Sequence, residues 1–96
     1  MGKLKLCWSK LALKTFLNQC LWYENNASHQ YAKTFSNNIQ KAISQVISMP
    51  STGRLEKKSA KKTYRSILSH PKSRIHYWYD DKELHIIGII FSQKTH

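Results

Sequence analysis

Basic and aromatic side chains occupy alternate positions in the C-terminal half of the chain. Arg74, His76 and Trp78 alternate with apolar residues, and Arg65 stands at a matching polar position in the stretch before them. Because alternate side chains of a strand lie on one face, we expect these four to share one face of a sheet. Guanidinium groups bind phosphate, imidazole transfers protons near neutral pH, and indole rings stack on bases. The pattern favours a nucleic-acid-binding face over an ordinary solvated sheet face.

The net charge indicates the same kind of partner. Sixteen Lys and Arg residues stand against five Asp and Glu residues, which gives a formal charge of +11. Such an excess suits a polyanion, although a solvated basic surface kept for solubility is the alternative. Further candidates for contact with a nucleic-acid backbone or an rRNA groove are Arg54, Lys57, Lys58, Lys61, Lys62 and Lys72.

Length and composition limit what the chain can be. The 96 residues suffice for one domain, residues 1–96. The longest apolar run, residues 86–91, is too short to span a membrane, and lysines interrupt every apolar stretch near the N-terminus. We therefore expect an intracellular, cytoplasmic protein with no membrane partner.

Cysteine and histidine positions predict no metal site. Cys7 and Cys20 form no CxxC pair, and we expect both to be buried, reduced thiols. The five histidines show none of the spacings typical of metal ligands. The sequence thus predicts neither a metal nor a cofactor.

The hydropathy pattern predicts an α+β domain with the element order βααβββ, in which a helical hairpin packs on one face of a small antiparallel sheet. The expected strands are residues 3–8, 63–68, 74–79 and 84–91, and residues 54–62 are expected to form an exposed loop. Ser9 and Ser28 are the expected helix N-caps, while Asn25-Asn26 and Met49-Pro50 end the helices. The two apolar stripes expected to cover the sheet are Leu13, Phe16, Leu17, Cys20 and Leu21, and then Ala32, Phe35, Ile39, Ala42, Ile43 and Val46.

This layout resembles the toxins of the RelE/ParE superfamily from bacterial type II toxin–antitoxin systems. The resemblance covers nearly the whole chain and rests on the element order together with several short motifs. These motifs are Met49-Pro50 followed by Gly53-Arg54, Tyr64-Arg65, Arg74-Ile75-His76-Tyr77, and the Ile-rich last strand that leads to Lys94. It implies a RelE/ParE-like fold and a toxin that arrests growth.

The resemblance implies one of two activities. RelE-like members are mRNA interferases: these endoribonucleases cut mRNA in the ribosomal A site without metal and so inhibit translation. The catalytic positions that the resemblance assigns to such an activity are Arg65, Arg74, Lys94, His76 and His96. Ile67 replaces a lysine of that cluster and the helical hairpin is long, both of which favour a ParE-like toxin that inhibits DNA gyrase without catalysis. A basic nucleic-acid-binding module unrelated to toxins is a third reading.

The resemblance also implies the partners. A cognate acidic antitoxin is expected to hold the basic toxin, using a disordered segment that folds as it wraps around its target. The expected target is mRNA on the ribosome, with DNA gyrase as the alternative.

Overall fold

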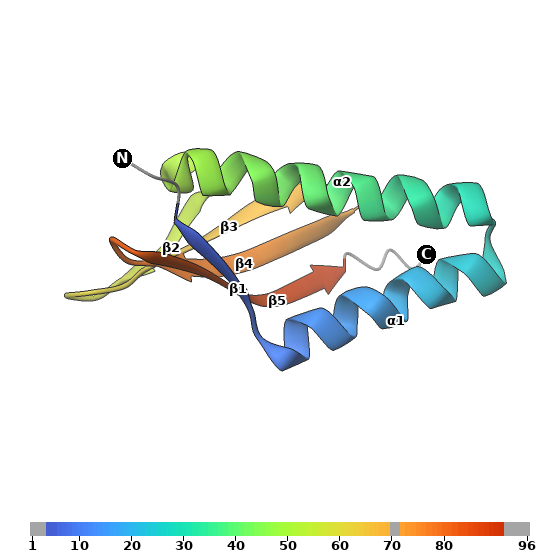
Figure 1. The fold of residues 1–96 in the computed structure, drawn as a ribbon, viewed down its shortest axis with the longest axis horizontal. Coiled ribbons are helices and arrows are strands. Elements are labelled where there is room, and N and C mark those ends of the chain that lie inside the picture. Colours follow the sequence, from blue (N-terminus) through green and yellow to red (C-terminus); the bar gives the residue numbers. More distant parts are fainter. Residues whose placement is uncertain (1–3, 70–71, 92–96) are drawn as a thin grey trace.

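The protein forms two layers, a helical hairpin and a five-stranded sheet, in the computed structural model, which describes residues 4–69 and 72–91 (Figure 1). The elements in chain order are β1 (Lys5–Trp8), α1 (Lys10–Asn26), α2 (His29–Ser48), the 3₁₀ turn η1 (Pro50–Thr52), β2 (Arg54–Lys58), β3 (Thr63–Ser69), β4 (Ser73–Tyr79) and β5 (Glu83–Phe91). The predicted α+β class and helical hairpin are confirmed. Within the described ranges, no helix is long and apolar enough to cross a membrane.

The sheet has the strand order β1-β5-β4-β3-β2. The strands β2 to β5 pair antiparallel through short connections, whereas β1 pairs parallel with β5. A parallel neighbour needs a long connection, and the chain between β1 and β5 supplies it. As a result, the N-terminal strand lies beside the last strand, and residues from opposite ends of the sequence meet at one edge.

Residues 54–58 form the edge strand β2, so the prediction of a loop across 54–62 is wrong for this part. All five residues of β2 are exposed, and therefore no apolar period marks the strand in the sequence. Backbone pairing with β3 creates it, with a register irregularity between Leu55 and Lys57. Such irregular, charged edge strands resist pairing with another chain.

Both helices begin and end where the sequence predicts. The Ser9 hydroxyl accepts a hydrogen bond from the Ala12 N–H at 3.0 Å, and the Ser28 hydroxyl accepts one from the Tyr31 N–H at 3.0 Å. These caps satisfy N–H groups that have no partner within the helix. Met49, which precedes proline, ends α2 with φ −143° and ψ 84°, outside the helical region.

The core lies between α2 and the sheet. All six residues of the predicted second stripe are buried, and all of them except Ala32 pack with Ile75, Tyr77, Leu84 and Ile86 of the sheet. The first stripe is largely wrong as a prediction of core: Phe16 is buried, but Leu13, Leu17 and Leu21 are 41%, 50% and 59% exposed. The helix instead buries Ala12 and Phe16, and the described residues 4–69 and 72–91 leave the three leucines exposed.

Tyr77 links the sheet to the turn that follows α2. Its side chain is fully buried, and its hydroxyl donates to the Pro50 carbonyl at 2.6 Å and accepts from the Gly53 N–H at 3.2 Å. Burial raises the pKa of the hydroxyl, which keeps the donated proton in place.

Replacing Tyr77 with phenylalanine should destabilise the protein by about 1–3 kcal/mol, because the partly buried Pro50 carbonyl and the buried Gly53 N–H lose their partner together. Urea unfolding followed by circular dichroism measures this loss. Tyr31→Phe, at a hydroxyl-bearing ring that is 42% exposed on α2, is the matched control and should leave the midpoint nearly unchanged. Equal midpoints for the two variants would show that the Tyr77 hydroxyl contributes nothing.

Candidate functional site

The sheet face opposite the helices, called the open face here, carries the side chains of chemical interest. Strand register defines it: Tyr64 lies opposite Trp78, Ser66 opposite His76, and Trp78 opposite His85, while Ile75 and Tyr77 are buried under the helices. This face carries Arg54, Glu56, Tyr64, Ser66, Arg74, His76, Trp78 and His85. The structure thus brings Arg74, His76 and Trp78 to one face, as the alternation predicts.

A hydrogen-bonded polar cluster of Arg54, Glu56, Ser66 and Arg74 extends across the open face from the edge strand β2 over β3 to β4. The Ser66 hydroxyl donates to the Glu56 carboxylate at 2.5 Å and accepts from the Arg74 guanidinium at 2.9 Å. Arg54 donates to the same carboxylate through Nε at 3.1 Å and through its terminal nitrogen at 2.8 Å. The hydrogen bonds from Ser66 and then Arg54 lower the pKa of Glu56 from its ordinary value near 4.5. The cluster therefore holds one ionised carboxylate between two guanidinium groups.

His76 borders open space beside this cluster. It lies opposite Ser66 on one side and opposite Gly88 on the other. A Cβ atom built at Gly88 would meet nothing within 4 Å, so no side chain of residues 4–69 and 72–91 fills the space next to it. A ligand phosphate or sugar could therefore reach His76 and Arg74 from solvent.

Aromatic rings form a platform next to the polar cluster. The Trp78 and His85 rings are stacked, with centroids 4.2 Å apart and planes inclined by 6°. The Tyr64 and Trp78 ring centroids are 6.5 Å apart, and the Lys62 ammonium lies 4.4 Å from the centroid of the Trp78 ring. A cation over an indole ring is favourable. Tyr64, Trp78 and His85 are half-buried, and their remaining exposed ring surface suits contact with a base.

Arg65 does not share this face, and the prediction that it does is wrong. It lies opposite Tyr77 and on the same side as the core. Its guanidinium donates to the Gly53 carbonyl at 3.0 Å and to the Tyr79 hydroxyl at 3.1 Å. The strand β3 carries apolar residues on both faces, so the alternation gave no unique facing, and a one-residue error moves every side chain across the sheet.

The other predicted residues lie around the open face or outside the described ranges. Lys57 and Lys58 lie on the edge strand β2, Lys61 and Lys62 follow it in the turn before β3, and all four are exposed. Lys72 is exposed in the turn before β4 with a φ of 32°. Lys94 and His96 fall outside the residues that the structure describes.

Glu56 and Ser66 are the members of the polar cluster that sequence reasoning missed, and Glu56 carries its negative charge. The position of Glu56 two residues after Arg54 is a weak signal, because such a pair faces one side only if the segment is a strand. The loop predicted there concealed this relation.

Replacing Glu56 with glutamine should lower stability near pH 7, and this loss should shrink as the pH is lowered toward 3. A carboxylate with a lowered pKa stabilises the fold above its unfolded-state value, and this contribution is lost as the pH falls through the folded-state pKa. Urea midpoints of parent and variant at both pH values measure the effect. A difference that persists undiminished in acid would mean that the ionised form of Glu56 is not what stabilises the cluster.

Comparisons with known proteins establish the fold. No family model matches the sequence, and no curated protein matches it. A structure described as the chromosomal ParDE TA system from P. aeruginosa is similar with a TM-score of 0.74 at 13% identity, covering 95% of this chain and 98% of that one. The YoeB dimer from Staphylococcus aureus is similar with a TM-score of 0.58 at 18% identity, covering 96% and 100%. The RelE/ParE-like fold implied by the resemblance is therefore confirmed.

Proposed function

We infer that this protein is the toxin of a type II toxin–antitoxin system and that it acts as a RelE-like, ribosome-dependent mRNA endoribonuclease. The fold shared with the ParDE and YoeB structures supports the toxin assignment. The observation that carries the nuclease assignment is the polar cluster beside His76, in which an ionised carboxylate, two guanidinium groups and an imidazole share one open face.

The cluster fits metal-free cleavage by the ribose 2′-OH. In the proposed step Glu56 accepts the 2′-OH proton, O2′ bonds to the adjacent phosphorus, and the bond from phosphorus to O5′ breaks. Protonated His76 donates a proton to the leaving O5′, so that the products are a 2′,3′-cyclic phosphate and a 5′-OH. Arg74 stabilises the charge that develops on the phosphorane.

Substrate positioning must supply much of the acceleration. The lowered pKa keeps Glu56 ionised but makes it a modest base. Holding the reacting atoms in line compensates for modest acid–base groups, and the ribosome would provide that alignment. The Trp78–His85 stack would hold a base of the mRNA. The lysines on β2 and in the turn before β3 would contact the phosphate backbone of the RNA.

A gyrase-inhibiting, ParE-like toxin is the second candidate. The helices α1 and α2 are 17 and 20 residues long, which matches the long hairpin implied for that branch. The structural role of Arg65 also removes one cation from the predicted catalytic set.

Two assays on one purified protein separate the candidates. Toeprinting on ribosomes that translate a defined mRNA should reveal cleavage within the A-site codon, and DNA supercoiling by gyrase should proceed normally. Inhibited supercoiling with intact mRNA would replace the first candidate with the second. If the mRNA stayed intact and gyrase supercoiled DNA normally, neither the ribosome nor gyrase would be the target.

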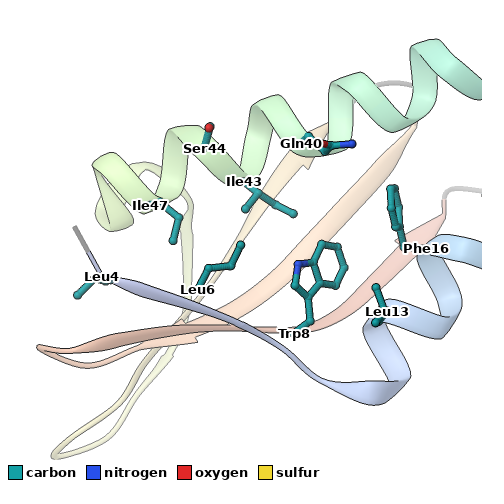
Figure 2. Close-up of a pocket in the computed structure, with 9 residues that line it drawn as sticks. All are labelled: Leu4, Leu6, Trp8, Leu13, Phe16, Gln40, Ile43, Ser44 and Ile47. Atoms are coloured by element: carbon teal, nitrogen blue, oxygen red, sulfur yellow. The ribbon is translucent and has the colours of Figure 1, made fainter.

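The expected antitoxin has a surface to bind on the helical hairpin. An apolar groove of about 530 Å³ runs between α1, α2 and β1 (Figure 2). In Figure 2, Leu6 and Trp8 project from β1 toward Ile43 and Ile47 of α2, and Phe16 closes one end. The exposed stripe of Leu13, Leu17 and Leu21 continues along α1 into a second groove beside α2. An amphipathic segment could bury these side chains, and its acidic residues would neutralise the +11 charge.

Association between toxin and antitoxin should slow as salt rises, because opposite charges speed encounter, while apolar anchors set the dissociation rate. Stopped-flow measurements on the purified pair test the first point. A double change, Leu17→Ser with Leu21→Ser, should speed dissociation, whereas Leu11→Ser, at an exposed leucine that lines neither groove, should not. A salt-independent association rate would exclude electrostatic steering, and equal dissociation rates would exclude the leucine stripe as the contact.

A further inference from the structure

The geometry points to a zinc site at the edge of the open face, built from Cys7, Glu83 and His85. Strand β1 supplies the thiol and β5 supplies the carboxylate and imidazole. Parallel pairing sets Cys7 opposite His85, and Glu83 lies two residues before His85 on the same face. The ligand atoms of the three side chains all lie within 4.8 Å of one another.

The chemistry of this set fits Zn²⁺ better than a hard cation. Zinc binds thiolate, imidazole and carboxylate in tetrahedral sites, whereas Mg²⁺ and Ca²⁺ prefer oxygen ligands alone. Cys7 as thiolate and Glu83 as carboxylate supply two negative charges, which match the charge of the ion. Local neutralisation matters because the protein as a whole carries +11 and repels cations. Three protein ligands leave a fourth position for water.

The side chains are held in place before any metal arrives. The His85 ring nitrogen Nε2 and a Glu83 carboxylate oxygen are 2.9 Å apart, and the His85 ring is fixed by its stack on Trp78. All three ligands are half-buried, with 28% of the His85 side chain exposed. Metal binding would replace the contact between Glu83 and His85 with two bonds to one ion and would require little movement of the strands.

Two features elsewhere in the chain lack this combination and serve as controls. His29 and Glu24 form a pair at 2.6 Å, but no cysteine joins them in a group of three ligands within the described ranges, and the His29 side chain is 78% exposed. Cys20 on α1 is the other free cysteine, and burial followed by the nearby Glu24 charge raises the pKa of its thiol. Neither should hold a metal ion tightly.

The test is titration of the purified, reduced full chain with Co²⁺ and then Zn²⁺. Cobalt in a tetrahedral site with a thiolate gives visible d–d bands and a near-ultraviolet thiolate charge-transfer band. We expect one cobalt ion per chain with both signals, displacement by one equivalent of zinc, and a higher melting temperature with zinc bound.

Single substitutions decide which residues bind the ion. Cys7→Ser should abolish the charge-transfer band, and His85→Phe, which keeps a ring on Trp78, should weaken binding by at least about 100-fold. Cys20→Ser and His29→Asn should bind as the parent does, and circular dichroism of each variant confirms folding. If Cys7→Ser fails to fold, His85→Phe and Glu83→Gln carry the test. The proposed site would be wrong if the parent showed no charge-transfer band, or if Cys20→Ser lost that band. It would also be wrong if a folded His85→Phe or Glu83→Gln variant bound the metal ion with the affinity of the parent. The toeprinting and supercoiling assays are independent of this outcome.

Discussion

Replacing Gly53 with alanine should destabilise the protein by about 3 kcal/mol or more. Gly53 is buried in the turn between η1 and β2, and an added Cβ would lie 2.6 Å from both the Ser66 carbonyl oxygen and the Tyr77 hydroxyl. The first belongs to the backbone of β3, which is paired on both sides with β2 and β4, and the second is fixed by its hydrogen bond to Pro50, so neither can move aside cheaply. The φ of Gly53 is −75°, so lack of space, not backbone conformation, requires glycine here.

Gly88→Ala is the matched control for Gly53→Ala. A Cβ at Gly88 would meet nothing within 4 Å, and Gly88 lies in the middle of β5. Alanine gives the unfolded chain less conformational entropy than glycine does, so less entropy is lost when the strand forms. We expect this variant to be as stable as the parent or more stable, by up to about 1 kcal/mol. The urea midpoint of unfolding is measured for the parent, Gly53→Ala and Gly88→Ala. Similar midpoints for the two variants would mean that the turn after η1 yields to an extra methyl group.

The parts of the fold predicted correctly are those that local sequence determines. The two serine caps and the Met49-Pro50 stop act within a few residues of their own position, and the α2 stripe repeats at helical spacing. Its hydrophobic period is strong because one side of α2 meets the core along its whole length. Such signals need no knowledge of distant segments.

The parts predicted incorrectly depend on pairing between segments. The edge strand β2 is exposed along its length and exists through backbone hydrogen bonds to β3, which leave no mark in the order of side chains. The facing of Arg65 follows from its register with Tyr77, since β3 alone is apolar on both sides. The exposed leucines of α1 have the helical period of a core stripe, yet the part of the chain that the structure describes leaves them exposed.

The candidate site divides in the same way. Alternation within β4 predicts that Arg74, His76 and Trp78 share a face, and the structure places them so. Glu56 joins them only because β2 pairs with β3. Cys7 meets His85 only because the N-terminal strand returns to the last one, and no spacing of cysteine and histidine in the sequence encodes that. Sites assembled across strands require the topology as well as the sequence.

Replacing Arg74 with alanine should slow ribosome-dependent mRNA cleavage by about 100- to 1000-fold and should leave the fold intact. Arg74 is half-buried on the open face, and its guanidinium binds Ser66, whose hydroxyl keeps its second partner, Glu56, when Arg74 is removed. The packing loss is therefore small. The phosphorane, in contrast, would lose the cation that neutralises its developing charge in the proposed step. Single-turnover cleavage of mRNA on programmed ribosomes measures the rate.

Three further variants show whether the effect of Arg74 comes from its position. Arg74→Lys keeps the charge but not the planar bidentate fork, so it should recover only part of the rate. Lys41→Ala removes one charge from the exposed side of α2, and it should cleave at the parental rate. Arg65→Ala should act differently again: because Arg65 binds the Gly53 carbonyl and the Tyr79 hydroxyl, the variant should unfold at lower urea. If a folded Arg74→Ala variant cleaved mRNA at the parental rate, Arg74 would have no role in catalysis and the proposed site on the open face would be wrong. If Lys41→Ala lost as much cleavage rate as Arg74→Ala, the effect of Arg74 would come from the net charge of the protein and not from its position.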